Sequence, residues 1–216
     1  TFALMLALFR KLVKEANHVA KGEWVRVTGN EIMGKTLSII GLGRIGKEVA
    51  IRANAFGMKV IGYDLYWDED FARGNQIIRA KSIDEALEQG DVVSLHVNLS
   101  DETRELINRE RLSKMKDGVV ILNCARGEII HTQDVIDALH AGKIGGYGTD
   151  VLDVEPPPLD HPMLNAPNTV ITPHIGSRTF ESVERQATMA ARNLVLALRG
   201  ETPLAQANDA PLTPHT

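Results

Sequence analysis

The sequence has a single cysteine, Cys124, and aromatic residues make up only 5% of its 216 residues. One cysteine excludes an internal disulfide and fits a reducing compartment, so we expect a cytoplasmic protein. The unbroken apolar run at residues 2–9 is far shorter than the ~20 residues that a membrane-spanning helix needs. Histidines and carboxylates are not clustered at the spacing of metal ligands, so no metal site is expected.

An excess of positive charge is missing too. The 24 Lys and Arg residues are scattered and are outnumbered by 28 Asp and Glu residues, which gives a formal net charge of −4. The sequence therefore predicts neither a nucleic-acid partner nor a membrane surface. What is present is ordinary for a globular protein, with 44% hydrophobic and 24% charged residues in a chain long enough for one large core.

Short β-branched runs alternate with helical patterns along the chain, as in a parallel sheet with helices on both faces. The runs are apolar almost throughout, which fits strands that are buried on both sides. We expect strands at about residues 36–41, 58–63, 77–79, 91–97, 118–123, 145–151 and 169–172. The predicted fold class is therefore α/β.

Helical spacing predicts helices at about 2–21, 132–140 and 179–199, the last of which Gly200 would end. Ser82 followed by Glu85 predicts a capping box at the start of another helix. A further helix after residue 43 would pack through one face, formed by Ile45, Val49, Ala53 and Phe56.

The expected organisation is a single domain over residues 1–200, with a core at about 25–176. The helices at 2–21 and 179–199 would flank this core. Residues 201–216 are rich in proline and are expected to form a flexible tail.

The segment Gly41-Leu42-Gly43-Arg44-Ile45-Gly46 lies between an expected strand and an expected helix, which is the context of a dinucleotide-binding loop. Gly41 permits a tight turn, Gly43 lets backbone N–H groups approach a pyrophosphate, and Gly46 lets the helix pack on its strand. The loop favours a Rossmann-type doubly wound sheet. The alternative is a glycine-rich turn without a ligand.

Asp64 ends the next expected strand, where a carboxylate can accept hydrogen bonds from the adenosine ribose hydroxyls. It would also repel a 2′-phosphate, and the neighbouring Leu65 and Tyr66 provide no cation to neutralise one. The expected cofactor is therefore NAD rather than NADP.

Polar side chains that follow the later strands should meet at the carboxyl edge of the sheet, where ligands of such folds lie. Among them are Arg126, Glu155 and His174, which suit the reduction of a 2-oxo acid. Arg126 can hold the substrate carboxylate and polarise the carbonyl, His174 can exchange the proton, and Glu155 can favour the imidazolium. Each also has a structural alternative, as a surface ion pair, a residue beside a turn or a loop histidine.

Two other polar residues at strand ends have less certain roles. His96 ends the fourth expected strand and is divided between a role at the cofactor and a role in the core. Cys124 is expected to be a buried thiol beside the cofactor rather than a nucleophile, because no histidine is placed in sequence to activate it. His18, His140, His161 and His215 are expected to be structural or solvated.

With these segments identified, the chain resembles the cofactor-binding domain of the D-isomer-specific 2-hydroxyacid dehydrogenases, a family that includes D-3-phosphoglycerate, glyoxylate/hydroxypyruvate and D-lactate dehydrogenases. The matching stretches occur in family order. They are Gly34-Lys35-Thr36-Leu37, the glycine loop, Asn123-Cys124-Ala125-Arg126-Gly127, Asp150-Val151-Leu152-Asp153-Val154-Glu155-Pro156 and Thr172-Pro173-His174-Ile175-Gly176-Ser177.

The resemblance implies that Arg126, Glu155 and His174 are the catalytic residues of an NAD-dependent enzyme. It implies cofactor contacts at Arg44, Ile45, Asp64, Val97, Asn98, Cys124, Ala125, Arg126, Asp150, Gly176 and Ser177, in addition to Gly41, Gly43, Gly46, His96 and His174. It also implies a small 2-oxo or 2-hydroxy acid as substrate and a homodimer. Formate dehydrogenases share the fold, but Pro173 and Glu155 argue against that branch.

Three features depart from the family pattern. Asn98 stands where a proline is usual, and His131 stands where an acid is common, at an expected helix start. Family members also carry roughly a hundred residues before this point, which form most of a substrate domain. We therefore expect the chain to be a cofactor-binding portion that binds NAD(H) but turns over poorly by itself, with the apolar face of helix 179–199 exposed or dimerised.

Two other interpretations stay open. A non-catalytic NAD-sensing module, similar to corepressors with this fold, would have the same glycine loop. The chain could also be a degraded or incompletely sequenced gene product.

Overall fold

Two compact units make up the chain, Thr1–Pro173 and a second one from His174 onward. The computed structural model describes residues 1–206. Most of the predicted tail at 201–216 therefore lies outside the described residues, and the expectation that it is flexible stays a prediction.

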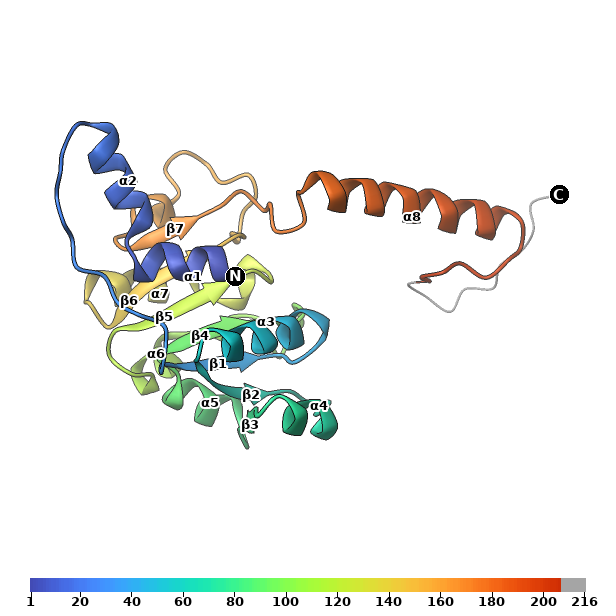
Figure 1. Ribbon diagram of the computed structural model, residues 1–216, viewed down its shortest axis with the longest axis horizontal. Helices are drawn as coiled ribbons and strands as arrows, with labels where there is room; N and C mark the ends of the chain where they lie inside the picture. Colours follow the sequence, from blue (N-terminus) through green and yellow to red (C-terminus); the bar gives the residue numbers. More distant parts are fainter. Residues whose placement is uncertain (207–216) are drawn as a thin grey trace. The chain divides into compact units, whose positions relative to one another are not determined.

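The first unit contains one sheet of seven parallel strands in the order β3-β2-β1-β4-β5-β6-β7 (Figure 1). The strands are β1 (Thr36–Ile40), β2 (Lys59–Tyr63), β3 (Ile78–Arg79), β4 (Val92–Leu95), β5 (Val119–Asn123), β6 (Ile144–Thr149) and β7 (Thr169–Ile171). Because β1 pairs with β2 on one side and with β4 on the other, the order reverses beside β1. The α/β doubly wound fold is confirmed, and the strand ends differ from expectation by one or two residues.

Helices cover both faces of this sheet. In the first unit they are α1 (Phe2–Phe9), α2 (Leu12–Ala20), α3 (Arg44–Ala55), α4 (Glu69–Gly74), α5 (Ile83–Gln89), α6 (Arg109–Lys114) and α7 (Thr132–His140), with 3-10 turns η1 (Gly127–Ile129) and η2 (Pro162–Asn165). The short helices α4 and α6 were not predicted from the sequence.

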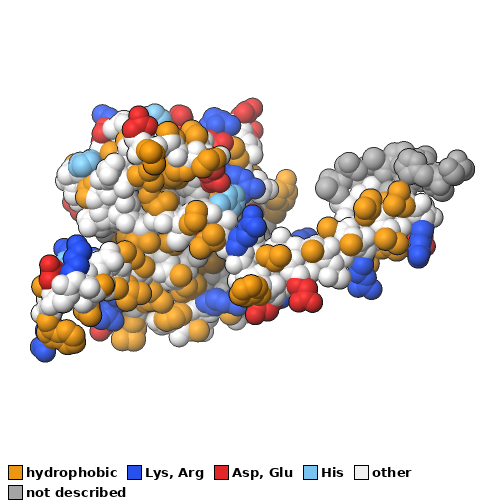
Figure 2. Space-filling model, turned by 90° about the horizontal axis from the view of Figure 1, so that it is seen from above, with side chains coloured by type: hydrophobic (Ala, Val, Ile, Leu, Met, Phe, Trp, Pro, Cys, Tyr) orange, Lys and Arg blue, Asp and Glu red, His pale blue; other side chains and the backbone are white. Residues whose placement is uncertain are grey.

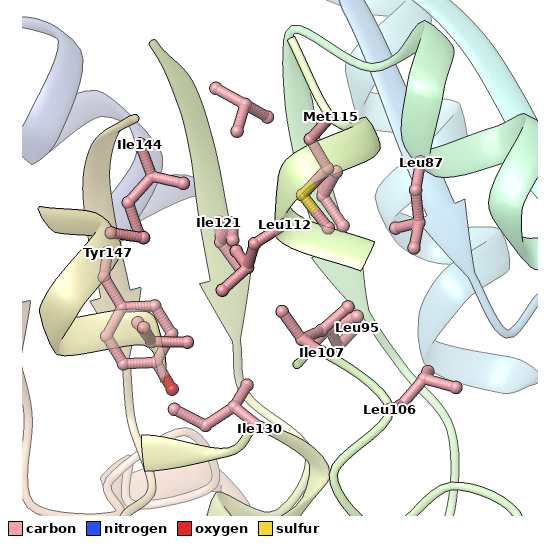
Figure 3. Close-up of a cluster of buried hydrophobic side chains, with 14 of the residues drawn as sticks. Leu87, Leu95, Leu106, Ile107, Leu112, Met115, Ile121, Ile130, Ile144 and Tyr147 are labelled. Carbon is pink, nitrogen blue, oxygen red and sulfur yellow. The ribbon is translucent and has the colours of Figure 1, made fainter. Parts of the chain in front are cut away.

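Two hydrophobic clusters lie on opposite faces of the sheet. Successive residues of β5 alternate between them, with Val119 and Ile121 in one and Val120 and Leu122 in the other. The first cluster joins the sheet to α5, α6 and α7 and includes the fully buried Tyr147 (Figure 3). The second joins it to α1 and α3. This packing on both faces explains why the strands are apolar throughout.

The prediction of one helix at 2–21 is wrong, because two helices occupy this segment. Helix α1 ends at Phe9, and Lys11 has a left-handed backbone with φ 51° that turns the chain before α2. The first helix buries Leu4, Met5 and Phe9 against the sheet, whereas α2 buries no residue of its own. The change of direction follows from this packing, which the nearly continuous apolar pattern does not reveal.

The predicted packing face of the helix after residue 43 is half correct. Val49 and Ala53 are buried, but Ile45 is 64% exposed and Phe56 is 44% exposed. The capping prediction is confirmed at Ser82, whose Oγ accepts from the Glu85 N–H at 3.1 Å. The Glu85 carboxylate accepts from the N–H of Lys81 rather than from that of Ser82, at 2.6 Å.

The described part of the second unit contains a turn, the helix α8 (Phe180–Leu198) and a short segment after it. Thr179 caps this helix through its Oγ1, and Gly200 follows its end with φ 73°, as predicted. Within its own unit α8 buries none of its residues, and Figure 2 shows hydrophobic side chains along it. No helix in the described part of the chain has the length and hydropathy to span a membrane.

Candidate functional site

The glycine loop connects β1 to α3, and two of its glycines are required by the fold itself. Gly41 has φ 96°, and a Cβ atom there would lie 2.5 Å from the carbonyl oxygen of His96. A Cβ at Gly46 would lie 2.0 Å from the carbonyl oxygen of Gly41. Both positions therefore exclude any side chain for reasons of packing.

Gly43 differs, because the fold does not require a glycine there. Its φ is −68°, and apart from its chain neighbours no described atom lies within 4 Å of a Cβ built on it. Helix α3 begins immediately after it, and no described side chain caps the free N–H groups of this helix. Open space over uncapped N–H donors suits the pyrophosphate of a dinucleotide.

Asp64 lies just after β2 and braces the loop. Its Oδ2 accepts from the N–H of Leu42 at 2.6 Å, and its Oδ1 accepts from the N–H of Tyr66 at 2.7 Å. Each carboxylate oxygen has a second lone pair, so the side chain keeps the capacity to accept from ribose hydroxyls.

The loop and Asp64 line a cavity of about 980 Å³ that is formed entirely by the first unit. This volume is at the upper end for small-molecule sites and is ample for a nucleotide. The predicted residues that line it are Gly41, Gly43, Arg44, Ile45, Asp64, His96, Val97 and Asn98. The exposed Ile45 is thus at the cavity wall rather than in the core.

Sequence reasoning missed other residues of this cavity. They are Ile40, Tyr63, Leu65, Tyr66, Ile83, Ser100, Glu102, Thr103 and Leu106. Thr103 donates through Oγ1 to the carbonyl oxygen of Asn98 at 2.6 Å, which closes the turn after Asn98. The last four of these residues belong to no motif, and their place follows from the path of the chain after β4.

The contacts of His96 suit both of the roles between which its prediction was divided, and its role at the cofactor stays a prediction. His96 lines the cavity, and its Nε2 lies 2.8 Å from the Oγ of the buried Ser94. Burial lowers the pKa of His96 to about 4, because a charged ring loses hydration there. The neutral ring is thus the form present at pH 7.

The low pKa of His96 predicts a loss of stability in acid. An unfolded histidine has a pKa of about 6.5, so between pH 6.5 and 4 the unfolded state binds more protons than the folded one. His96→Gln should remove up to about 3 kcal/mol of the decrease in unfolding free energy over this window. Urea unfolding at pH 7 and pH 4.5 measures it, with exposed His140→Gln as control. Equal decreases in wild type and H96Q would contradict the assignment.

The loop that carries Arg126 follows β5 and is anchored by the buried Asn123. The Asn123 side chain accepts from the N–H of Ala125 at 3.1 Å and donates to the carbonyl oxygen of Arg126 at 2.8 Å. The Arg126 side chain is exposed, as its predicted role requires. Cys124 is half-buried rather than buried, because it lies at the strand end where the sheet meets solvent.

The loop that carries Glu155 follows β6 and lies against the Arg126 loop. A Cβ at Gly127 would lie only 2.0 Å from the carbonyl carbon of Leu152, so the two backbones are in direct contact. The exposed Glu155 accepts through Oε1 from the N–H of Leu152 at 2.9 Å. Asp150, 6% exposed, accepts from the Thr172 hydroxyl at 2.5 Å. Thus Arg126, Asp150 and Glu155 come from adjacent loops at the carboxyl edge.

His174, Gly176 and Ser177 belong to the second unit, where all three are exposed. His174 has φ 52°, an uncommon backbone conformation for a residue with a side chain. The predicted meeting of His174 with Arg126 and Glu155 joins residues of different units and stays a prediction. The described residues contain no cluster of His, Cys, Asp and Glu that could hold a metal ion.

Comparison with known proteins identifies relatives with the same segments. Residues 2–176 match the family described as D-isomer specific 2-hydroxyacid dehydrogenase, NAD binding domain. The glyoxylate reductase of Thermofilum pendens is 40% identical over 216 residues, covering 96% of this chain and 63% of the relative. The D-3-phosphoglycerate dehydrogenase of Methanocaldococcus jannaschii is 41% identical over 203 residues, covering 93% and 38%.

A solved structure agrees with these sequence matches. The D-lactate dehydrogenase of Aquifex aeolicus, complexed with NAD and lactic acid, has a TM-score of 0.85 and 35% identity, covering 93% of this chain and 65% of that one. The chain therefore spans less than two thirds of the length of these relatives. The predictions of family and of NAD as its cofactor are confirmed. With its sheet order, glycine loop and matched residues, the chain belongs to the NAD-binding domain family of the D-isomer-specific 2-hydroxyacid dehydrogenases.

Proposed function

We propose that this chain binds NAD(H) and serves the interconversion of a 2-oxo acid and a D-2-hydroxy acid. The observation that carries the proposal is the cavity of about 980 Å³ over Gly43, with free helix N–H groups at its floor and Asp64 at its wall. The adjacent loops of Arg126 and Glu155 supply groups suited to the second reactant.

Bound NADH supplies the hydride that adds to the carbonyl carbon of the 2-oxo acid. The Arg126 guanidinium binds the substrate carboxylate and polarises the carbonyl group. His174 gives its proton to the carbonyl oxygen as the hydride arrives, and takes it back in the reverse direction. Glu155 carries a negative charge that favours the protonated imidazole.

Replacing Asp64 tests the cofactor proposal and its specificity. Asp64→Ala should weaken NADH binding by about tenfold or more, because hydrogen bonds to a charged acceptor are lost. The substitution should also remove the repulsion between Asp64 and the 2′-phosphate of NADPH. NADPH binding should therefore weaken less than NADH binding, and the preference for NADH over NADPH should fall. Fluorescence titration of the 216-residue chain with each cofactor gives both dissociation constants.

Asp64 also accepts from the N–H of Leu42, so its replacement could weaken binding by distorting the glycine loop. The ratio of the NADH and NADPH affinities distinguishes this effect from a loss of ribose recognition. A disturbed loop would weaken NADH and NADPH equally, which would argue against the proposed role. Asp70→Ala is the matched control, because Asp70 is an exposed carboxylate on α4 that is paired with Arg73 and does not line the cavity.

The substrate is proposed only as a class. Relatives are named glyoxylate reductase, hydroxypyruvate reductase, D-3-phosphoglycerate dehydrogenase and D-lactate dehydrogenase, which act on small 2-oxo or 2-hydroxy acids. Rates of NADH oxidation by the full-length protein with glyoxylate, hydroxypyruvate, phosphohydroxypyruvate and pyruvate would choose among them.

We also propose a homodimer in the cytoplasm. Leu12, Val13 and Val19 of α2 are more than half exposed, and an apolar helix surface of this kind is stabilised when a second copy covers it. Sedimentation as a monomer at micromolar concentration would contradict the dimer. The cytoplasmic location has the support of the single cysteine.

A further inference from the structure

A network of polar groups at the base of the Glu155 loop is not used by the proposed reaction. Its centre is Asp153, whose Oδ2 accepts from the Thr132 hydroxyl at 2.7 Å and whose Oδ1 lies 2.9 Å from Nε2 of His161. Thr132 begins α7 and His161 precedes η2, so one carboxylate joins three segments that are far apart in sequence.

The hydrogen bonds of His161 indicate which of its ring nitrogens carries the hydrogen atom. Its ring is 6% exposed, and Nδ1 accepts from the N–H of Met163 at 3.3 Å. The proton therefore lies on Nε2 and is donated to Asp153. Burial raises the pKa of Asp153, but hydrogen bonds from Thr132 and His161 outweigh it, so the pKa lies below its ordinary value and the carboxylate is charged.

The position of Asp153 relates this network to the site. It is two residues before Glu155, and the intervening backbone turns so that the N–H of Leu152 donates to the Glu155 carboxylate. The same backbone, at Leu152 and Asp153, touches Gly127, which follows Arg126. A shift of the Asp153 backbone would therefore displace the groups that hold both proposed catalytic side chains.

We propose that Asp153 is a positioning residue that is held in place by Thr132 and His161. Its position maintains the hydrogen bond from the Leu152 N–H to the Glu155 carboxylate and the contact between the Glu155 loop and the Arg126 loop. The importance of this for the reaction rests on the proposed function. The hydrogen bond between the Leu152 N–H and the Glu155 carboxylate is a property of the chain itself and can be measured without any substrate.

The test removes one hydrogen bond and keeps the side-chain shape. Thr132→Val removes the hydrogen bond from the Thr132 hydroxyl to the charged Asp153 carboxylate. The Leu152 amide should then exchange about tenfold faster, and Thr132→Ser should restore its protection. The Val135 amide of α7, which donates to the carbonyl oxygen of His131, should be unchanged. Hydride transfer should slow by about tenfold or more, because small displacements of catalytic groups lower rates strongly.

Thr169→Val is the matched control. Thr169 is the first residue of β7, at the amino ends of the strands, and its hydroxyl donates to the carbonyl oxygen of Ala166 rather than to Asp153. The proposal is overturned if Leu152 exchange in T132V matches wild type, or rises in parallel with exchange across the whole unit. It is also overturned if Leu152 exchange rises but hydride transfer does not slow while Glu155→Gln does slow it. If E155Q leaves the rate of hydride transfer unchanged, the proposed function of Glu155 fails. The exchange rate of the Leu152 amide in T132V still decides whether Asp153 positions Glu155.

Discussion

Replacing His174 with asparagine is expected to slow hydride transfer from NADH to a 2-oxo acid by about 10³-fold, the usual range for a lost general acid. Asparagine preserves polarity but cannot supply the proton that the carbonyl oxygen needs. NADH affinity should be largely retained, because the cavity over Gly43 is lined by residues of the first unit and asparagine keeps a polar side chain at position 174. Single-turnover absorbance at 340 nm, with the chain in excess over NADH, measures the transfer even if steady-state turnover is slow.

His140→Asn is the control for this substitution, since His140 is exposed at the end of α7. It should transfer hydride at the wild-type rate. A full-length wild-type protein that binds NADH but transfers no hydride to any 2-oxo acid would favour the NAD-sensing module. Equal rates in H174N and wild type would show that another group supplies the proton.

The same substitution at two glycines of one loop should have opposite consequences. Gly46→Ala should lower the free energy of unfolding by about 3 kcal/mol or more, because a Cβ atom would lie 2.0 Å from a backbone oxygen that cannot move freely. Gly43→Ala should change it by less than about 1 kcal/mol, since space and φ both allow alanine. Instead, G43A should weaken NADH binding by about tenfold or more by occupying the place of the pyrophosphate.

Urea unfolding and NADH titration of both variants provide the four measurements. The glycine loop would lose its assigned role if G43A bound NADH like wild type. A stable G46A variant with full affinity would show that α3 can move away from the loop, contrary to the packing described here.

The sequence predicted features that depend on local pattern. Apolar runs identified all seven strands because strands buried on both faces leave few polar residues between turns. Ser82 and Gly200 marked helix ends because capping is a contact within a few residues. Glycine spacing located the loop for the same reason.

Contacts between distant segments escaped prediction. The break at Lys11 depends on how α1 lies on the sheet, and the apolar pattern continues through it. Helical spacing placed Ile45 on the packing face of its helix, and only the family resemblance indicated a place beside the cavity, which residues far along the chain help to build. His161 was expected to be structural, but its contact with Asp153 through Nε2 joins segments whose spacing in the sequence does not predict it.

The sequence by itself determined the fold class, the family and the identity of the residues suited to chemistry, because each depends on residue type and on spacing along the chain. Tertiary structure decided which of two glycines in one loop is required for packing and which leaves room for a ligand. It also decided that the loops of Arg126 and Glu155 are in backbone contact, and that Asp153 is linked to the start of α7 and to His161 before η2. Those facts arise where parallel strands end side by side, and adjacency of strands in a sheet is set by packing rather than by their order in the chain.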